Sequence, residues 1–163
     1  MRPPRLAGFS YVGCYQYFLT ICAFERRLHF TTAGLVEDVK TTFLRTADEE
    51  KFAILAYCFM PDHVHLLAEG ENSSSDLRSF VATAKQRAAH EARRWIHGRM
   101  WQSGFFDRIL REEDGAQDIA RYIVQNPLRA RLVQSVLDYP FWGSARWSRE
   151  DLVESTMWRP GAP

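Results

Sequence analysis

The stretch YCFMPDHVHLL, residues 57–67, joins two apolar runs through a Pro-Asp turn and carries two histidines two positions apart. The turn predicts a β-hairpin built from residues 52–60 and 63–69. Because side chains alternate along a strand, His63 and His65 would project from the same face. Two adjacent imidazoles can hold a metal ion, but a working divalent site usually needs a third protein ligand or several waters. Histidines on strands are also common as surface or hydrogen-bonded core residues, so the spacing alone does not establish a metal site.

The composition is that of one globular domain. At 163 residues and 46% apolar content, the chain can bury one sizeable core and is too short for two ordinary domains. Eighteen of the 21 basic residues are arginine, which suits bidentate contacts to phosphate, although a GC-rich genome gives the same bias. The formal charge is only +1, yet residues 76–112 hold eight basic against four acidic side chains. A nearly neutral chain can therefore still present a basic face to a polyanion.

The three cysteines, Cys14, Cys22 and Cys58, form an odd set without a close-spaced pair. This spacing argues against a disulfide framework and against a structural zinc site. The sequence also lacks an uninterrupted apolar run of membrane-spanning length. We therefore expect reduced cysteines in a cytoplasmic protein without an export signal or membrane segment.

Hydrophobic periodicity and turn residues predict short strands alternating with longer helices. The expected elements beside the hairpin are strands at 15–24 and 105–111 and helices at 35–47, 76–96 and 114–126, the last ending before Pro127. The resulting order is β-α-β-β-α-β followed by a helix. This order predicts an α+β fold with a ferredoxin-like, or RRM-like, antiparallel sheet, two helices on one face and an added C-terminal helix and tail.

The last expected helix places Tyr122 and Asn126 four residues apart, hence on one face and within reach of a common point. A phenol and an amide oxygen would be co-located there. Tyr122 could equally be a packing residue, and Asn126 is also a common residue at a helix C-terminus. The residues themselves leave both interpretations open.

Two blocks of sequence carry a family resemblance. The run AYCFMPDHVHLL, residues 56–67, resembles the Met-Pro-Asp/Asn-His-Val-His-Leu-Leu signature of single-tyrosine His-hydrophobic-His transposases. The run YIVQNPLRARLV, residues 122–133, resembles the Tyr-Ile-x-x-Asn-Pro-x-x-Ala-Gly-Leu-Val block of the same family. It departs from that block at Arg131, where the family usually has glycine.

Further similarity points to one branch of the family, the REP-associated tyrosine transposases. The matching segments are YFLTIC with Arg26-Arg27, WQSGFFD at 101–107 and DYPFWGS at 138–144. The similarity thus extends from about residue 8 to residue 146. It predicts a single-tyrosine transposase catalytic domain over residues 1–135. Residues 136–163 are expected to form a tail that packs on this domain or is partly disordered.

The resemblance implies a reaction and the residues that perform it. His63, His65 and Asn126 would bind a divalent ion, Mg²⁺ or Mn²⁺, and Tyr122 would be the nucleophile. The metal would neutralise charge on a phosphate while the tyrosine attacks in line. The product would be a 5′-phosphotyrosine link and a free 3′ hydroxyl, which can reverse the reaction onto another strand.

The implied partner is single-stranded DNA folded into hairpins, which would place the protein at the nucleoid. Such recognition combines a basic track with bases stacked on aromatic rings. Candidate DNA-binding residues are Arg2, Arg5, Arg78, Lys85, Arg87, Arg93 and Arg94. Trp142 and Trp147 could stack on bases, but packing of the tail is the role we expect. The sequence leaves open whether the protein is a monomer or a homodimer, and whether Tyr122 acts in its own chain or in a partner.

Three functions remain open from the sequence. The first is a transposase, or a domesticated relative, that cleaves and rejoins single-stranded DNA. The second is a non-catalytic module that binds single-stranded DNA or RNA through its ferredoxin-like sheet. The third is a small metal-dependent hydrolase that uses water and forms no covalent intermediate. A Tyr122→Phe variant separates the first from the other two.

Overall fold

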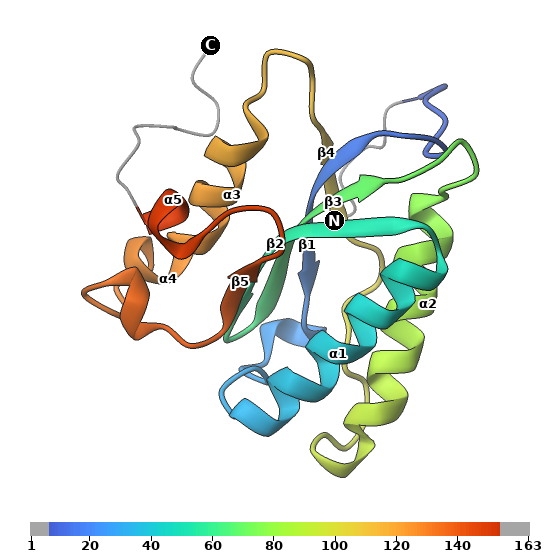
Figure 1. Cartoon of the computed structure of the whole chain (residues 1–163). Coiled ribbons are helices and arrows are strands. Elements are labelled where there is room, and N and C mark those ends of the chain that lie inside the picture. The colour runs from blue at the N-terminus through green and yellow to red at the C-terminus, as the bar shows by residue number, and fades with distance from the viewer. Residues whose placement is uncertain (1–6, 154–163) are drawn as a thin grey trace.

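The computed structural model describes residues 7–153 of the chain, shown in Figure 1. Its strands are β1 (Gln16–Cys22), β2 (Phe52–Met60), β3 (His63–Gly70), β4 (Phe106–Ile109) and β5 (Trp142–Ser144). Its α-helices are α1 (Ala33–Glu49), α2 (Leu77–Glu91), α3 (Ala116–Val124), α4 (Asn126–Arg129) and α5 (Arg149–Val153). Short 3-10 helices are η1 (Phe24–Arg26), η2 (Ala92–Arg94) and η3 (Val136–Asp138).

The strands form one antiparallel sheet in the order β4-β1-β3-β2-β5. The first four strands have the order of a ferredoxin-like sheet, so the predicted fold class is confirmed. The fifth strand was not predicted as a strand. Its three residues pair with the outer edge of β2, where Ala56 lies opposite Ser144 and Cys58 opposite Trp142.

Helices cover both faces of this sheet, and each face has its own apolar core (Figure 1). Helices α1 and α2 pack on one face, against side chains such as Leu19, Val64 and Leu66. Helix α3 packs on the other face over β2, β3 and β5, against side chains such as Cys58 and Leu67. Because alternate residues of a strand face opposite sides, His63 and His65 lie on the α3 face.

Several elements are shorter than the sequence predicted, among them helix α2 and strand β4. Helix α2 begins where Asp76 accepts hydrogen bonds from the backbone N–H groups of Arg78 and Ser79, as a capping residue does. It ends at Glu91 and continues as η2 only to Arg94, although the apolar pattern extended the prediction to residue 96. Strand β4 has four residues rather than the seven expected for 105–111. These differences lie at the ends of elements. The exact end of a helix or strand depends on fraying and on local turns.

The chain does not leave the helical conformation at Pro127 as predicted. Helix α3 ends at Val124, and α4 begins at Asn126 with the proline in its first turn. A first-turn residue needs no N–H donor within the helix, so proline is accommodated there. Arg131 then adopts φ 57, the left-handed conformation that favours glycine, and the N–H of Leu132 donates to the carbonyl of Pro127 at 2.9 Å. The turn that ends this helix therefore forms with arginine in the place of glycine.

The tail lies against the α3 face as far as the structure describes it. Trp142 is buried, and its Nε1 donates to the carbonyl oxygen of Val136 at 3.0 Å. Arg2 and Arg5, two of the candidate DNA-binding residues, lie outside the described residues, as does the end of the tail. Among the helices that are described, none has the length and apolarity needed to cross a bilayer.

Candidate active site

Strand β3 places the two histidine rings side by side, as the alternation predicted. The Nε2 atoms of His63 and His65 are 3.1 Å apart, and the ring centroids are 4.6 Å apart with the planes at 80°. The neighbouring strand contributes Thr20, which lies directly opposite His65 in the sheet register. The two Nε2 atoms thus converge on one point in front of the sheet.

The other nitrogen of each ring is held by a neighbouring side chain. Nδ1 of His63 donates to Oδ1 of Asp62 at 2.6 Å, and Nδ1 of His65 is 3.0 Å from Oγ1 of Thr20. The Asp62 carboxylate is in turn ion-paired with Nε of Arg26 at 2.8 Å. A carboxylate or hydroxyl on the far nitrogen orients a histidine and increases its strength as a ligand. The arrangement therefore fixes both rings with Nε2 outward.

Burial also sets the protonation state of the pair. It lowers the pKa of His65 to about 3, with the neighbouring His63 acting in the same direction. Burial likewise lowers the pKa of His63, and the nearby Asp62 carboxylate opposes this effect. Both rings are therefore neutral at neutral pH, which is the form that binds a metal.

The residues present fit a small divalent cation. Two cis ligands at about 2.1 Å from an octahedral ion are about 3.0 Å apart, close to the observed 3.1 Å between the Nε2 atoms. Within residues 7–153, no group of three or more His, Cys, Asp or Glu side chains could hold a metal. A third protein ligand would then be an uncharged oxygen. Nδ2 of Asn126 donates to the carbonyl oxygens of Tyr122 at 3.0 Å and Ile123 at 3.1 Å, which leaves Oδ1 as an acceptor, and its role as the third ligand stays a prediction.

Helix α3 brings Tyr122 to the same face of the sheet as the histidines. The ring of Phe18 on β1 contacts both side chains. Its centroid is 5.8 Å from that of Tyr122 and 5.3 Å from that of His65. The guanidinium of Arg129 lies over the Tyr122 ring, 3.8 Å from its centroid. The charge of Arg129 also contributes, after burial, to the low pKa of His65. The tyrosine, the arginine and the histidine pair therefore occupy one neighbourhood.

The described candidate DNA-binding residues lie in the α1/α2 layer, on the opposite face of the sheet from the histidines. Several of them make internal contacts. Nζ of Lys85 donates to the carbonyl oxygens of Gln102 and Gly104, Arg87 pairs with Glu49 and Arg94 pairs with Asp38. The Arg78 guanidinium lies 5.0 Å from the centroid of the Tyr11 ring.

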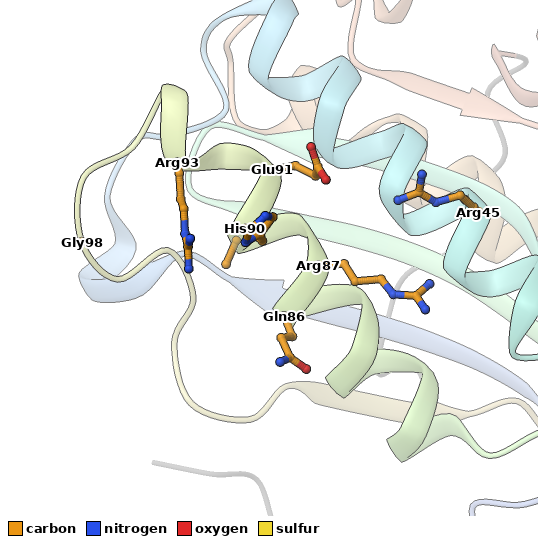
Figure 2. Close-up of a pocket in the computed structure, with 8 residues that line it drawn as sticks. Arg45, Gln86, Arg87, His90, Glu91, Arg93 and Gly98 are labelled. Carbon is orange, nitrogen blue, oxygen red and sulfur yellow. The ribbon is translucent and has the colours of Figure 1, made fainter.

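A shallow groove of about 720 Å³ runs along the end of α2 (Figure 2). Arg45 of α1 lines it together with Arg87, His90, Glu91 and Arg93, and Figure 2 shows their side chains along the outer side of the helices. The structure thus brings Arg87 and Arg93 together, but not next to Tyr122. A role for these residues in DNA binding stays a prediction.

Four residues of this neighbourhood were not identified as site residues from the sequence. Asp62 stood in the motif itself, where a carboxylate next to a histidine is a readable signal of support for a metal ligand. Thr20 and Phe18 reach the site only through the pairing of β1 with β3, across about 45 positions of sequence. Arg129 arrives because α4 continues past Pro127. These three contacts depend on tertiary structure and have no local sequence signal.

The sheet, the paired imidazoles and the tyrosine helix on the same face match the arrangement expected of a single-tyrosine transposase, and comparison with known proteins gives the family. The family model described as "Transposase IS200 like" matches residues 11–126, and the chain belongs to this IS200-like transposase family. It is distantly homologous to REP-associated tyrosine transposases over most of its length. The protein of this name from Escherichia coli strain K12 is 22% identical over 131 residues, covering 80% of this chain and 77% of that protein.

Two further comparisons support the same relationship. A Haemophilus influenzae protein assigned to the REP-associated tyrosine transposases is 24% identical over 136 residues, covering 77% of each chain. A solved structure of a REP-associated tyrosine transposase bound to a REP hairpin superposes with a TM-score of 0.74 at 22% identity, covering 87% of this chain and 82% of that one. That likeness extends the shared fold to the greater part of the chain.

Proposed function

We propose that this protein cleaves and rejoins single-stranded DNA at or near hairpins, through a covalent 5′-phosphotyrosine intermediate on Tyr122. The observation that carries the proposal is the convergence of the His63 and His65 Nε2 atoms, 3.1 Å apart, on the sheet face against which Tyr122 packs. Family membership supports DNA cleavage as the type of reaction. We place the catalytic domain at residues 1–135 and treat residues 136–163 as a tail.

In the proposed step the phenolic oxygen of Tyr122 attacks a backbone phosphorus of the DNA. The new bond joins this oxygen to phosphorus, and the bond from phosphorus to the 3′ oxygen breaks. The phenol proton leaves to solvent, and the departing 3′ oxygen takes up a proton to become a hydroxyl. Because one phosphodiester is exchanged for another, the reverse attack by a 3′ hydroxyl rejoins DNA without an external energy source.

The metal site of this proposal consists of His63, His65 and Asn126, with Mg²⁺ or Mn²⁺ as the ion. A divalent ion bound there supplies charge neutralisation at the phosphate. Asp62 and Thr20 hold the two imidazoles with Nε2 toward the phosphate, and burial keeps the rings unprotonated. Phe18 and Arg129 both contact the ring of Tyr122.

The substrate class is proposed from the relatives. One solved relative is bound to a REP hairpin, and we propose that this chain also acts on hairpin-bearing single strands. The basic residues on α2 and η2 are candidates for contacts with the DNA backbone away from the reacting phosphate, and Arg2 and Arg5 are candidates for further backbone contacts.

A covalent-adduct assay tests the proposal. The protein is incubated with labelled single-stranded hairpin oligonucleotides and Mg²⁺, then denatured and separated by gel electrophoresis. We expect a labelled protein band that survives denaturation, disappears in Tyr122→Phe and in the presence of a chelator, and falls strongly in His63→Ala. Mass spectrometry of the digested band should place the nucleotide on Tyr122.

The same assay separates the alternatives. A water-using hydrolase would leave cleaved DNA without an adduct, and Tyr122→Phe would still cleave. A binding module would shift the oligonucleotide in a native gel and leave it intact. An adduct that persists in Tyr122→Phe would show that another residue is the nucleophile.

A further inference from the structure

A row of side chains crosses the sheet from its outer edge to the histidine pair. Phe106 on β4 lies opposite Thr20 on β1, and Thr20 lies opposite His65 on β3. Residues directly opposite each other in an antiparallel pair point to the same face. With strands about 4.8 Å apart, the backbone of Phe106 is about 10 Å from that of His65, separated by a single intervening residue.

The ring of Phe106 is open to solvent on this face. Helix α3 covers β2, β3 and β5 and reaches β1 at Phe18, while β4 forms the outer edge of the sheet beyond β1. The exposed fraction of Phe106 is 40%, among the larger values for an apolar side chain of a strand in this protein. Natural edge strands usually carry charged or polar side chains because these discourage pairing with other chains. An exposed phenylalanine is unusual on an edge strand, and its ring is available to bind a partner.

The neighbouring side chain does not supply a strong charge. Arg108 follows on the same face of β4, but it is ion-paired with Asp114 at 2.6 Å. The attraction of this surface for a nucleic acid would thus come mainly from the flat ring. Aromatic rings bind single strands by stacking on their bases, which is tolerant of sequence and is not available in a closed duplex.

We propose that Phe106 is a stacking platform for a base of single-stranded DNA adjacent to the phosphate that reacts with Tyr122. The position of this base rests on the proposed function, because the histidine pair defines where the phosphate lies. The row Phe106–Thr20–His65 places the ring on the same face of the sheet as the histidine pair, one residue beyond Thr20. The platform would fix the strand in line with the nucleophile.

The test measures binding of single strands by variants at one position. The probes are dA12 carrying one 2-aminopurine and an unmodified dT12. All protein variants are made in the Tyr122→Phe background so that no cleavage occurs. Phe106→Leu keeps apolar bulk without an aromatic face, Phe106→Trp keeps the face, and Leu44→Ala removes a similarly exposed apolar side chain (39%) from the other layer. Thermal melting and binding of a 12-base-pair duplex control for folding.

We expect Phe106→Leu to weaken binding of both single strands about 5- to 100-fold, the usual effect of losing one stacked base. Phe106→Trp should bind as tightly as the parent and alter the 2-aminopurine fluorescence, and Leu44→Ala should bind normally. The dependence on salt should have the same slope in all variants, because no phosphate contact is lost. Duplex binding should not change.

The proposal is overturned if Phe106→Leu binds single strands like the parent, if it weakens duplex binding equally, or if Phe106→Trp does not restore affinity. It is also overturned if rA12 binds tighter than dA12 and only the RNA complex responds to the substitution. Failure of the proposed function is distinguishable, because it is measured by the covalent adduct with an intact Tyr122. If Phe106→Leu with an intact Tyr122 forms the adduct normally and binds DNA with unchanged affinity, the stacking platform is rejected and the proposed function stands.

Discussion

The guanidinium of Arg129 lies over the Tyr122 ring, with its central carbon 3.8 Å from the ring centroid. It also donates a hydrogen bond to the Tyr122 carbonyl oxygen. The two residues are seven positions apart and belong to successive helices. Because Arg129 contacts both the side chain and the backbone of the tyrosine, it restricts the ring to one orientation. Under the proposed function its positive charge would lie beside the attacking side chain.

Replacing Arg129 should slow adduct formation without abolishing DNA binding. A cation on an aromatic face contributes about 1–2 kcal/mol, so Arg129→Ala should lower the single-turnover rate about tenfold or more. Arg129→Lys should recover part of the loss, because it keeps the charge but not the planar contact. Rapid-quench measurement of the adduct checks this, with Arg45→Ala in the α1/α2 layer as the control. Unchanged rates in both Arg129 variants would exclude this role.

Removing the carboxylate behind His63 should weaken metal binding. Asp62→Asn replaces the acceptor of the Nδ1 hydrogen bond and breaks the ion pair to Arg26. Loss of such a support typically costs about 10- to 100-fold in metal affinity. Isothermal titration with Mn²⁺ measures the effect, and Asp48→Asn on the exposed side of α1 is the matched control. Equal Mn²⁺ affinity in the two variants would contradict the assignment of the metal site.

The tyrosine and the histidines of one chain should form one working site. Phe18 touches both Tyr122 and His65 of the same chain, so no partner is needed to bring them together. Mixing Tyr122→Phe with His63→Ala should therefore leave the adduct at background level. If the site were shared between two chains, the mixture would recover up to about a quarter of wild-type activity by random pairing.

The stability of the metal-free protein should fall in acid because of His65. Its pKa is lowered to about 3 in the folded chain, so the unfolded chain takes up the proton first. Above pH 6.5 this histidine adds no pH dependence. Between pH 6.5 and about 3 it lowers the free energy of unfolding by up to about 1.4 kcal/mol per pH unit, and below that range the effect levels off.

Urea unfolding at several pH values, with a chelator present, measures this dependence. His65→Gln removes the titrating ring and should have a smaller slope between pH 6 and pH 4. The same slope in the variant would show that other groups dominate the acid response. Added Mn²⁺ should stabilise the wild type at pH 7, where both imidazoles are unprotonated and can bind the ion.

Trp142 should matter for stability and not for DNA affinity. It is 4% exposed, packs in the α3 core and donates to the Val136 carbonyl. Trp142→Ala should lower the free energy of unfolding by about 3–5 kcal/mol. Trp95→Ala, at a tryptophan that is 43% exposed, should cost less. Fluorescence anisotropy with dT12, at a temperature where both variants are folded, should give affinities like that of the wild type.

The sequence was sufficient for the fold and for the histidine pair because both depend on local patterns. The alternation around the Pro-Asp turn predicted that His63 and His65 share a face, and their Nε2 atoms are within 3.1 Å. The order of strands and helices allowed few arrangements other than the ferredoxin-like one, since crossover connections and sheet pairing follow narrow rules. Strand β5 was not predicted because a segment of three residues is too short for its periodicity to distinguish a strand from a loop.

The contacts around the site were harder to predict for a different reason. The partner of His65 is Thr20, 45 residues earlier, and only the register of β1 against β3 brings them together. At Pro127 two rules competed, since proline restricts the residue before it but also begins helices well. The structure follows the second rule, and α4 thereby carries Arg129 back over Tyr122.

The short strand β5 also has a consequence for self-association. It occupies the outer edge of β2, and a side chain at Gly143 would meet Oη of Tyr57 at 2.5 Å, so the Tyr57 side chain lies over this glycine. An uncovered apolar edge of this length is a template for pairing with another sheet. Truncation before residue 142 would uncover the edge of β2 at Ala56, Tyr57 and Cys58. The three residues of β5 therefore shield the edge of β2 from pairing with another sheet, which would lead to aggregation.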